Sequence, residues 1–382
     1  MTLSRRLFLS GASALLAAPS IVLAQAPTER RFIFLMQRGA ADGLNIVVPY
    51  AEPAYARLRG ELAIDPASAL KLDGMFALHP SLTELAQLYK AGQASFFHAV
   101  ASSYRERSHF DGQNVLETGG SAPYTLKDGW MNRLLGLQSL PGKNAIAFAT
   151  TVPVAMRGAI DVSSYAPSAL PQASDDLLAR VEQLYANDVQ LHGLWSAALD
   201  ARSMAAGMGG GENRQKPAEL GRIAASFLAR ADGPRIAMIE TGGWDTHSAQ
   251  NNRLDAQLAN MNSMIAALRQ GLGDVWDKTV ILVATEFGRT VAVNGTGGTD
   301  HGTGAAAMLL GGAVQGGRVV SDWPGLSERD LLDGRDLRPT LGLDSLIAQT
   351  CAEVFRSDPE RAQHILFPGA AKDKSLPQLL RT

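Results

Sequence analysis

The sequence has little cysteine and little net charge, and each shortage excludes a class of protein. Cys351 is the only cysteine among 382 residues, so no disulfide can form within the chain and a thiol nucleophile has little to support it. Because Cys351 falls in an apolar helical pattern, we interpret it as a buried core thiol. The chain has 35 lysine and arginine residues against 37 aspartate and glutamate residues, a formal net charge of -2. This balance provides no broad basic surface, so nucleic acid is not an expected partner.

Residues 1–26 have the pattern of a twin-arginine export signal. Arg5 and Arg6 precede an apolar, alanine-rich stretch at about 11–24, and Ala24 and Ala26 form a small-x-small cleavage site. A short membrane anchor is the alternative, but the stretch is shorter than the roughly 20 residues that cross a bilayer. We therefore expect the twin-arginine translocase to export the folded chain to the periplasm. The mature protein, starting near Pro27, is expected to have no stable membrane anchor.

Apolar runs alternate with helical patterns along the rest of the chain, which predicts an α/β fold. Strands are expected at 32–36, 94–101, 144–150, 235–240, 279–285, 305–310 and 318–320, and helices at about 81–91, 174–188, 217–230, 251–271 and 343–355. Ser81 and Glu84 match a capping box at the start of the first helix. We expect residues 27–382 to form one domain with a mainly parallel central sheet and helices on both faces. Length alone would also allow two domains.

Acidic and histidine residues follow the ends of several expected strands. The candidates are Asp42 after the first strand, Asp245 and His247 after the strand at 235–240, Glu286 after the strand at 279–285, and Asp300 and His301 in a glycine-rich loop. The strand at 94–101 likewise runs into a polar string that contains Arg107, Ser108 and His109. Ligands of open α/β sheets bind at the carboxyl ends of the strands, so we expect these loops to meet at one edge.

Carboxylate oxygen and imidazole nitrogen together suit a divalent metal ion such as zinc, manganese or iron. Carboxylates that lie close together without a cation would repel and raise one another's pKa. Simpler interpretations stay open for two members: Asp245 with His247 can be a hydrogen-bonded loop pair, and Glu286 can be an ion-pair partner of Arg289. Of the remaining histidines, His79 is interpreted as structural, His98 and His109 are ambiguous, and His192 and His364 have no supporting neighbours. Trp130 and Trp244 either line a pocket or are simply buried.

Five blocks of the chain resemble a family of twin-arginine-exported proteins of unknown function within the alkaline-phosphatase and sulfatase-like superfamily. The blocks are GAADGLN at 39–45, RSHFD at 107–111, GGWDTH at 242–247, TEFGRT at 285–290 and GTDHG at 298–302. Together they extend over nearly the whole mature chain. The resemblance implies an alkaline-phosphatase-like sheet sandwiched by helices, with a divalent metal (zinc, manganese, magnesium or iron) bound at its carboxyl edge.

The resemblance also implies roles for individual residues. Metal ligands would be Asp42, Asp245, His247, Glu286, Asp300 and His301. Ser108 is the best-placed nucleophile, with Ser102 and Ser103 as competitors, and His109 belongs to the same catalytic group. Arg107, Arg105 or Arg289 would clamp the oxygens of a phosphate or sulfate. The chain departs from the superfamily where Glu286 and Phe287 replace an expected Asp-His pair, which leaves the number of ions open. It also lacks the cysteine motif of sulfatases that depend on formylglycine.

Three functions remain compatible with these residues. The leading hypothesis is a periplasmic metal-dependent hydrolase of phosphate or sulfate esters, with a small molecule or an envelope polymer as substrate. The second is a non-catalytic protein that retains a degenerate metal site and takes part in binding or assembly at the cell envelope. The third is a redox-active metalloprotein. The first requires the candidate residues to surround one cavity, so their arrangement in space discriminates it from the second.

Overall fold

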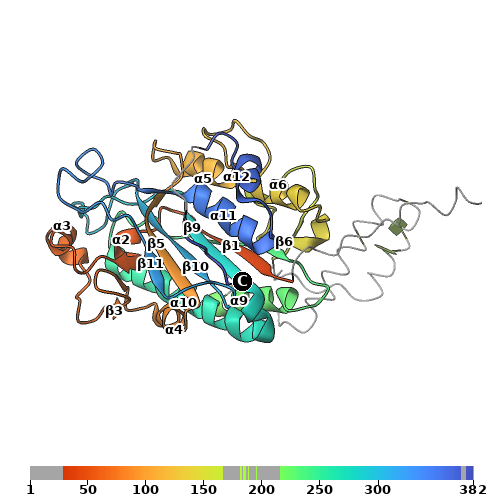
Figure 1. Ribbon diagram of the computed structural model, residues 1–382, viewed down its shortest axis with the longest axis horizontal. Coiled ribbons are helices and arrows are strands. Elements are labelled where there is room, and N and C mark those ends of the chain that lie inside the picture. Colours follow the sequence, from red (N-terminus) through yellow and green to blue (C-terminus); the bar gives the residue numbers. More distant parts are fainter. Residues whose placement is uncertain are drawn as a thin grey trace, which may run out of the picture.

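The computed structural model describes residues 29–166, 216–370 and 376–381, together with isolated residues between 181 and 195. The expected export signal, His192 and most of the helix expected at 174–188 therefore lie outside the described residues. The sequence predicts an α/β fold with a mainly parallel sheet between layers of helices, and the structure confirms it (Figure 1). Within the described residues, no helix has the length and apolarity needed to span a bilayer.

A nine-stranded sheet forms the centre of the molecule. Its strands lie in the order β11 (Arg318–Val320), β5 (Ala94–Ala101), β10 (Ala305–Leu310), β9 (Thr279–Thr285), β1 (Arg31–Gln37), β8 (Ile236–Thr241), β6 (Ala145–Phe148) and β7 (Ser163–Ser164), and β12 (Leu341–Gly342) also pairs with β5. All neighbouring pairs are parallel except those that β10 makes with β5 and β9. Because β10 runs in the opposite direction, its amino end lies at the same edge as the carboxyl ends of β1, β5, β8 and β9.

Both faces of the sheet are covered, as the unbroken apolar composition of its central strands requires. In β1, Phe32, Phe34 and Met36 point to one face and belong to a core built with α6 (Trp130–Leu137), α11 (Leu343–Phe355) and α12 (Pro359–Leu366). Ile33 and Leu35 point to the other face, towards α4 (Thr83–Lys90), α9 (Pro217–Leu228) and α10 (Gln250–Leu272). This period of two follows from the pleat of the strand.

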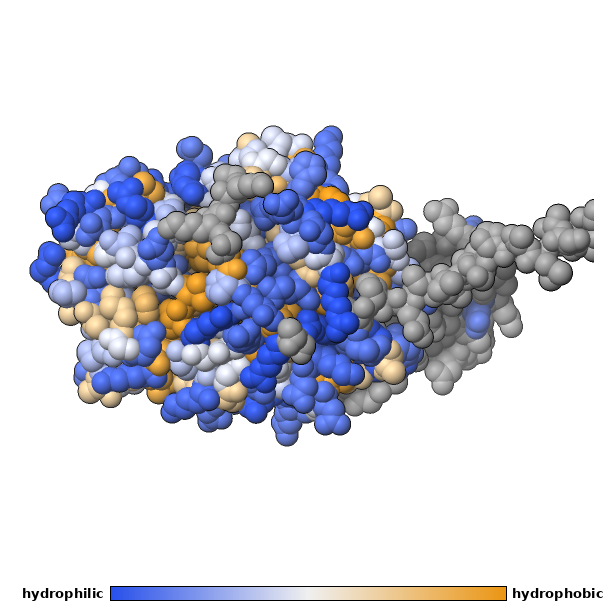
Figure 2. Space-filling view, in the orientation of Figure 1, coloured by the Kyte–Doolittle hydropathy of each residue, from blue (hydrophilic) through white to orange (hydrophobic). Residues whose placement is uncertain are grey.

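Figure 2 shows one face of the molecule, where hydrophilic side chains surround smaller hydrophobic areas.

Several elements of the structure differ from the sequence prediction. The expected capping box is wrong, because Leu82 is the N-cap of α4 and Ser81 donates its hydroxyl hydrogen to Asp255 instead. The polar string after β5 is in part a helix, α5 (His109–Thr118). The structure also has short elements beyond those predicted: the three-stranded sheet of β2 (Val47–Val48), β4 (Ala77–Leu78) and β3 (Leu70–Lys71), and the helices α2 (Gly43–Ile46), α3 (Tyr55–Arg59), α6 and α12.

Candidate metal centre

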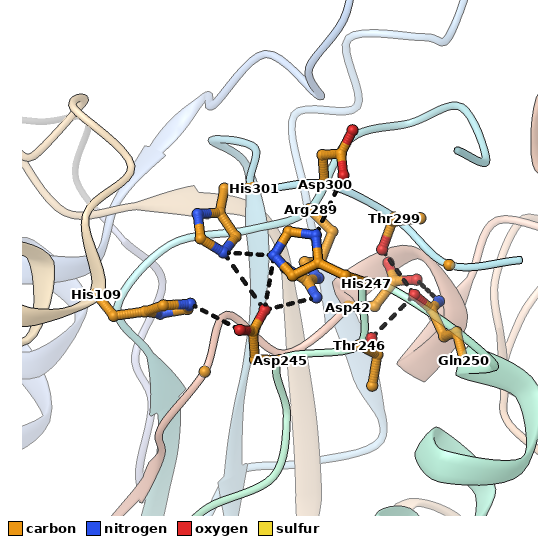
Figure 3. A network of polar contacts seen from close by, with 12 residues as sticks. Asp42, His109, Asp245, Thr246, His247, Gln250, Arg289, Thr299, Asp300 and His301 are labelled. Atoms are coloured by element: carbon orange, nitrogen blue, oxygen red, sulfur yellow. Dashed lines mark hydrogen bonds and ion pairs between the residues drawn. The ribbon is translucent and has the colours of Figure 1, made fainter. Parts of the chain in front are cut away.

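Side chains from four separate loops meet at the carboxyl edge of the sheet. His109 begins α5 after β5, Asp245 and His247 follow β8, Arg289 follows β9, and His301 precedes the reversed strand β10. Figure 3 shows the imidazoles of His109, His247 and His301 arranged around the carboxylate of Asp245. Ligand atoms of His109, Asp245 and His301 lie within 4.8 Å of one another. The expected convergence of strand-end loops is therefore present for these residues.

The ring of His109 is oriented by a buried carboxylate. Nδ1 of His109 lies 2.8 Å from Oε1 of Glu286, a side chain with no solvent exposure. Burial would raise the pKa of Glu286, but hydrogen bonds from His109 and Gln113 hold it below its usual value, so the carboxylate is ionised and accepts. Nδ1 therefore carries a proton, and in the neutral ring Nε2 presents a lone pair; the hydrogen bond to Glu286 raises the pKa of His109 above its usual value. Nε2 is buried and has no hydrogen-bond partner among the described residues, and it lies 3.4 Å from Asp245 Oδ2.

His247 and His301 are oriented in the same manner. Nδ1 of His247 lies 3.1 Å from Asp300 Oδ1, and Nδ1 of His301 lies 2.9 Å from the carbonyl oxygen of Arg107. Both acceptors place a proton on Nδ1 and leave Nε2 as the free nitrogen. The two Nε2 atoms are 2.9 Å apart, and they lie 3.1 Å and 3.3 Å from Oδ1 of Asp245. Three imidazoles thus turn the same nitrogen towards one carboxylate.

Asp245 is the shared centre of this cluster. Its Oδ1 accepts a hydrogen bond from Arg289 Nη2 at 2.9 Å. Burial would raise the pKa of Asp245, but the positive charge of Arg289, followed by those of the histidines, lowers it below the usual range. The guanidinium of Arg289 is itself buried, and its Nε and Nη1 have no hydrogen-bond partner among the described residues. Asp245 therefore remains an anion beside one fixed cation.

The arrangement of these donors fits a metal ion. Lone pairs on two Nε2 atoms 2.9 Å apart repel each other unless a proton or a cation lies between them. Ligand nitrogens of a tetrahedral zinc ion, at Zn–N distances of about 2.0–2.1 Å, lie about 3.3 Å apart, close to the spacings around Asp245. Metal-bound histidines also usually donate the other ring nitrogen to a carboxylate or carbonyl, as these three do. His109, Asp245 and His301 are therefore the residues that could hold a divalent ion, and His247, whose Nε2 lies 3.1 Å from Asp245 Oδ1, could join them.

Asp42, a sequence candidate for a metal ligand, has different partners. Its carboxylate is buried and accepts hydrogen bonds from Arg59 of α3, from Gln250 of α10 and from the backbone of Leu44. Gln250 in turn accepts from Thr246 and Thr299, which flank the metal-centre histidines in sequence (Figure 3). Asp42 thus anchors a buried polar network behind the cluster, and its hydrogen bonds go to that network.

Ser108 and Arg107 lie immediately before His109. The backbone N–H of Ser108 donates to the hydroxyl of Tyr104, and no hydrogen bond of the Ser108 hydroxyl is found among the described residues. Arg107 has a positive φ of 59°, which aims its carbonyl at His301, while its guanidinium pairs with the buried Asp336. The side chain of Arg107 is therefore already neutralised, whereas Arg289 retains free N–H groups.

Two glycines allow the loops to approach so closely. A Cβ atom on Gly39, whose φ is +119°, would lie 2.6 Å from the backbone nitrogen of Asp245. A Cβ atom on Gly298 would lie 2.3 Å from the carbonyl carbon of His247. Both contacts are shorter than side chains tolerate, so glycine is required at each position. The backbone N–H of Gly39 also donates to Glu286 at 2.8 Å, which joins the first-strand loop to the support of His109.

The remaining candidates have structural partners. His98 is fully buried, and burial lowers its pKa to about 4. His79 is buried and accepts from the backbone of Ser81, in agreement with the structural interpretation. Trp130 and Cys351 belong to the apolar core. Arg105 and the hydroxyls of Ser102 and Ser103 bind backbone carbonyls nearby.

Sequence reasoning did not identify Gln113, Gln250 or Arg59 as part of this region. Gln113 donates to Glu286 at 3.0 Å and to no residue of the cluster itself. Gln250 acts through Asp42, Thr246 and Thr299, and Arg59 acts through Asp42 and the carbonyls of Thr290 and Val291. All three support the site through other residues, and amide side chains carry no spacing signal that would distinguish them from solvent-exposed ones.

The fold and the cluster define an α/β protein with histidines gathered around an aspartate at the carboxyl edge of its sheet, a group that could hold a metal ion. The chain belongs to the family described as protein of unknown function DUF1501, whose model matches residues 29–365. Membership of a family of unknown function, expected from the five sequence blocks, is thereby confirmed, and export by the twin-arginine route stays a prediction. A comparison with curated proteins finds no match.

Several solved structures are similar to this chain at low sequence identity, and three of them are described below. The structure of Ps i-CgsB in complex with k-i-k-neocarrahexaose has a TM-score of 0.45 and 11% identity, over 88% of this chain and 74% of that one. The PsFucS1 sulfatase from Pseudoalteromonas sp. has a TM-score of 0.41 and 12% identity, over 94% of this chain and 72% of that one. A protein in the alkaline phosphatase superfamily from Vibrio parahaemolyticus has a TM-score of 0.38 and 12% identity, over 74% of this chain and 60% of that one.

Proposed function

We propose that the protein is an exported, metal-dependent hydrolase of phosphate or sulfate esters. The observation that carries the proposal is the common orientation of His109, His247 and His301, each with Nδ1 bonded to an acceptor and Nε2 turned to Asp245. Such an orientation leaves three lone pairs and one carboxylate for a cation. When bound, a divalent ion supplies Lewis-acid polarisation of an ester oxygen and lowers the pKa of a water or hydroxyl.

The donor set narrows the choice of metal. Imidazole nitrogens suit zinc, iron and manganese, whereas magnesium prefers oxygen ligands and retains its waters. Glu286 and Asp300 would act behind the histidines by fixing their tautomers. Zinc, iron or manganese is therefore expected in preference to magnesium.

The protein's own residues would bind and orient the ester. Arg289 holds its guanidinium against Asp245, and its positive charge would attract the anion to the centre, although its Nε–H and Nη1–H are buried and have no partner among the described residues. Ser108, one residue before His109, remains the candidate nucleophile, with a bound water as the alternative. Arg107 would contribute through its carbonyl, since its guanidinium is paired with Asp336.

Metal analysis with matched variants tests the centre. We expect about one metal ion per chain in the purified protein, and loss of the ion in Asp245→Ala and His301→Ala without unfolding. His79→Ala, which changes a histidine outside the cluster, is expected to retain the ion. A folded wild-type protein that binds none of zinc, iron or manganese would overturn the proposal.

Activity assays then test the reaction and its nucleophile. Metal-loaded protein is expected to hydrolyse 4-nitrophenyl phosphate or 4-nitrophenyl sulfate. With a serine nucleophile, Ser108→Ala lowers kcat by roughly 100-fold or more and leaves the metal content unchanged. An unchanged kcat in Ser108→Ala would assign the attack to water. If the wild-type protein hydrolyses neither ester, the result would argue for the binding or assembly role.

A redox role is a second candidate that one observation favours. Three imidazoles and one carboxylate also suit iron and manganese, and no serine hydroxyl contacts the cluster among the described residues. A bound iron or manganese ion with a reversible redox couple, together with no ester hydrolysis, would support this function.

Export is proposed from the twin-arginine pattern at the N-terminus. The translocase would be the partner during passage of the folded chain, and the periplasm the destination. Replacement of Arg5 and Arg6 by lysine is expected to leave the protein in the cytoplasmic fraction. Recovery of that variant from the periplasm would contradict the proposed route.

A further inference from the structure

A cavity of about 670 Å³ opens beside the metal centre, between α9 and α10. One wall is the end of β8 and the loop after it, from Glu240 to Trp244, and the next residue along the chain is Asp245. The backbone of Trp244 also packs against Gly39. The wall of the cavity therefore continues directly into the loop that carries Asp245, the carboxylate at the centre of the cluster.

Its position and size distinguish this cavity from the others. A cavity of about 510 Å³ is lined by Gln93 and Trp276, which precede β5 and β9, so it lies at the opposite edge of the sheet. Two more, of about 280 and 250 Å³, fall short of the roughly 300 Å³ at which ligand pockets usually begin. The cavity beside Trp244 alone among these four combines ligand-sized volume with the carboxyl edge.

Two amides of α10 present unpaired hydrogen-bonding groups to the cavity. Gln257 and Asn260 are one helical turn apart, and neither side chain has a hydrogen-bond partner among the described residues. The amide of Gln257 lies over Gly243, where a Cβ atom would be only 2.4 Å from Nε2. Amide groups both donate and accept, so such a pair is suited to hydroxyl groups.

Apolar side chains form the rest of the lining. Leu220 of α9 and Met261 and Met264 of α10 supply an apolar surface beneath the two amides. Lys216 is the one cation among the described lining residues, and the carboxylate of Glu240 is paired with Arg38. The described lining residues include no cluster of positive charges of the kind that a polyanion needs, and a fully aliphatic chain would bury the amides without partners.

We propose that this cavity binds a sugar ring of the ester substrate, with the apolar surface against the ring's C–H groups and the two amides on its hydroxyls. The inference rests on the proposed hydrolase function, because it names the alcohol part of the ester. The phosphate or sulfate would then extend past Trp244 to the metal centre, where Arg289 lies beside Asp245.

Binding of phosphonates, in which carbon replaces the ester oxygen, tests the proposal without hydrolysis. Isothermal titration of metal-loaded protein compares methylphosphonate with the 6-phosphonates of glucose, galactose and N-acetylglucosamine. At least one sugar phosphonate is expected to bind roughly tenfold or more tightly than methylphosphonate, since two hydrogen bonds are gained. The variant Gln257→Met/Asn260→Leu is expected to lose that preference while its affinity for methylphosphonate stays the same.

A control variant and two contradicting outcomes complete the test of the sugar site. Gln270→Met, which changes an exposed amide at the other end of α10, is expected to retain the preference. Equal affinity for all four phosphonates in the wild-type protein, or a preference that survives in the double variant, would overturn the sugar site.

Failure of every phosphonate to bind would defeat the ester-hydrolase proposal, and a second measurement then decides the sugar site. Saturation-transfer NMR with the methyl glycosides of the same sugars reports direct binding of the ring. Saturation transfer in the wild-type protein that disappears in the double variant supports the sugar site. Absence of saturation transfer in the wild-type protein overturns it.

Discussion

Glu286 accepts a hydrogen bond from Nδ1 of His109 at 2.8 Å, and this contact directs Nε2 of the imidazole towards Asp245. The same carboxylate oxygen accepts from the backbone of Gly39 and from Gln113. A buried carboxylate with three donors to one oxygen is well satisfied without a metal of its own. Its role in the proposed centre is therefore to orient His109 and to raise that ligand's basicity.

Replacing Glu286 by glutamine tests this role. The amide oxygen can retain the three donors, but the negative charge is lost, so we expect metal affinity to fall by about 10- to 100-fold with the fold intact. Competition with a chromophoric chelator measures the change. Glu84→Gln, which alters an acidic residue of α4 paired with Arg269, provides the control and should bind metal like the wild type. Unchanged affinity in Glu286→Gln would remove Glu286 from the centre.

Asp42→Asn distinguishes the network behind the cluster from the cluster itself. The substitution leaves the buried guanidinium of Arg59 without its counter-charge, which is expected to cost about 3–5 kcal/mol of unfolding free energy. Metal content of the folded variant should stay at the wild-type level, because the histidine and Asp245 donors are untouched.

An exposed ion pair supplies the control for that measurement. Asp232→Asn breaks the surface contact with Arg230 and is expected to leave the midpoint of urea denaturation close to that of the wild type. Loss of metal from Asp42→Asn at unchanged stability would contradict the structure and restore Asp42 as a ligand.

Burial of His98 makes stability depend on pH. Nε2 of His98 lies 2.8 Å from the carbonyl of Val47, and Nδ1 accepts from the backbone N–H of Ala99, so the neutral ring is fully bonded. Burial lowers the pKa from 6.5 to about 4. As pH falls below 6.5 the unfolded state takes up a proton that the folded state refuses, so stability is lost down to about pH 4. The contribution amounts to about 3 kcal/mol.

Urea denaturation at pH 7 and pH 4 measures this loss. In His98→Gln the difference between the two pH values should be smaller by about that amount, although the variant starts from a lower stability at pH 7. His364→Gln, which changes an exposed histidine of α12, should retain the wild-type difference. Equal pH dependence in His98→Gln and wild type would show that His98 takes up its proton in the folded state at an ordinary pKa.

Gly39→Ala is expected to disturb the metal centre from the first-strand loop. The new Cβ would lie 2.6 Å from the backbone of Asp245, in a backbone conformation that favours glycine. We expect the Asp245 loop to shift and metal affinity to fall by roughly tenfold or more, comparable to the loss of an outer partner. Gly74→Ala has open space around it and a conformation that alanine tolerates, so it should bind metal normally. Wild-type affinity in Gly39→Ala would show that the loops tolerate a wider spacing.

The sequence predicts the central strands well because each is a continuous apolar run buried on both faces. The strands expected at 94–101, 279–285 and 305–310 match β5, β9 and β10 residue for residue. The three-stranded sheet escapes prediction because its strands have two residues each, too few to show a period. Helix α5 escapes prediction because its first turn is the polar string after β5, which has the composition of a loop.

The sequence likewise predicts one part of the candidate site and not the other. Parallel strands end at one edge, so their position in the chain suffices to bring His109, Asp245 and His247 together, whereas His301 joins them from the amino end of the reversed strand β10. Which carboxylate faces the cluster and which faces a buried arginine depends on packing between distant elements. Asp42 follows β1 as Asp245 follows β8, yet α3 places Arg59 against the former. No local pattern carries that information.

The candidate centre depends on the insertion of the reversed strand β10 into the sheet. His301 reaches the other ligands only because β10 runs against β5 and β9, and β10 lies far along the chain from His109. The binding site is therefore incomplete in any folding intermediate that has not inserted this strand. The protein would therefore bind its first metal ion from the compartment in which the sheet is completed, before any later exchange of that ion.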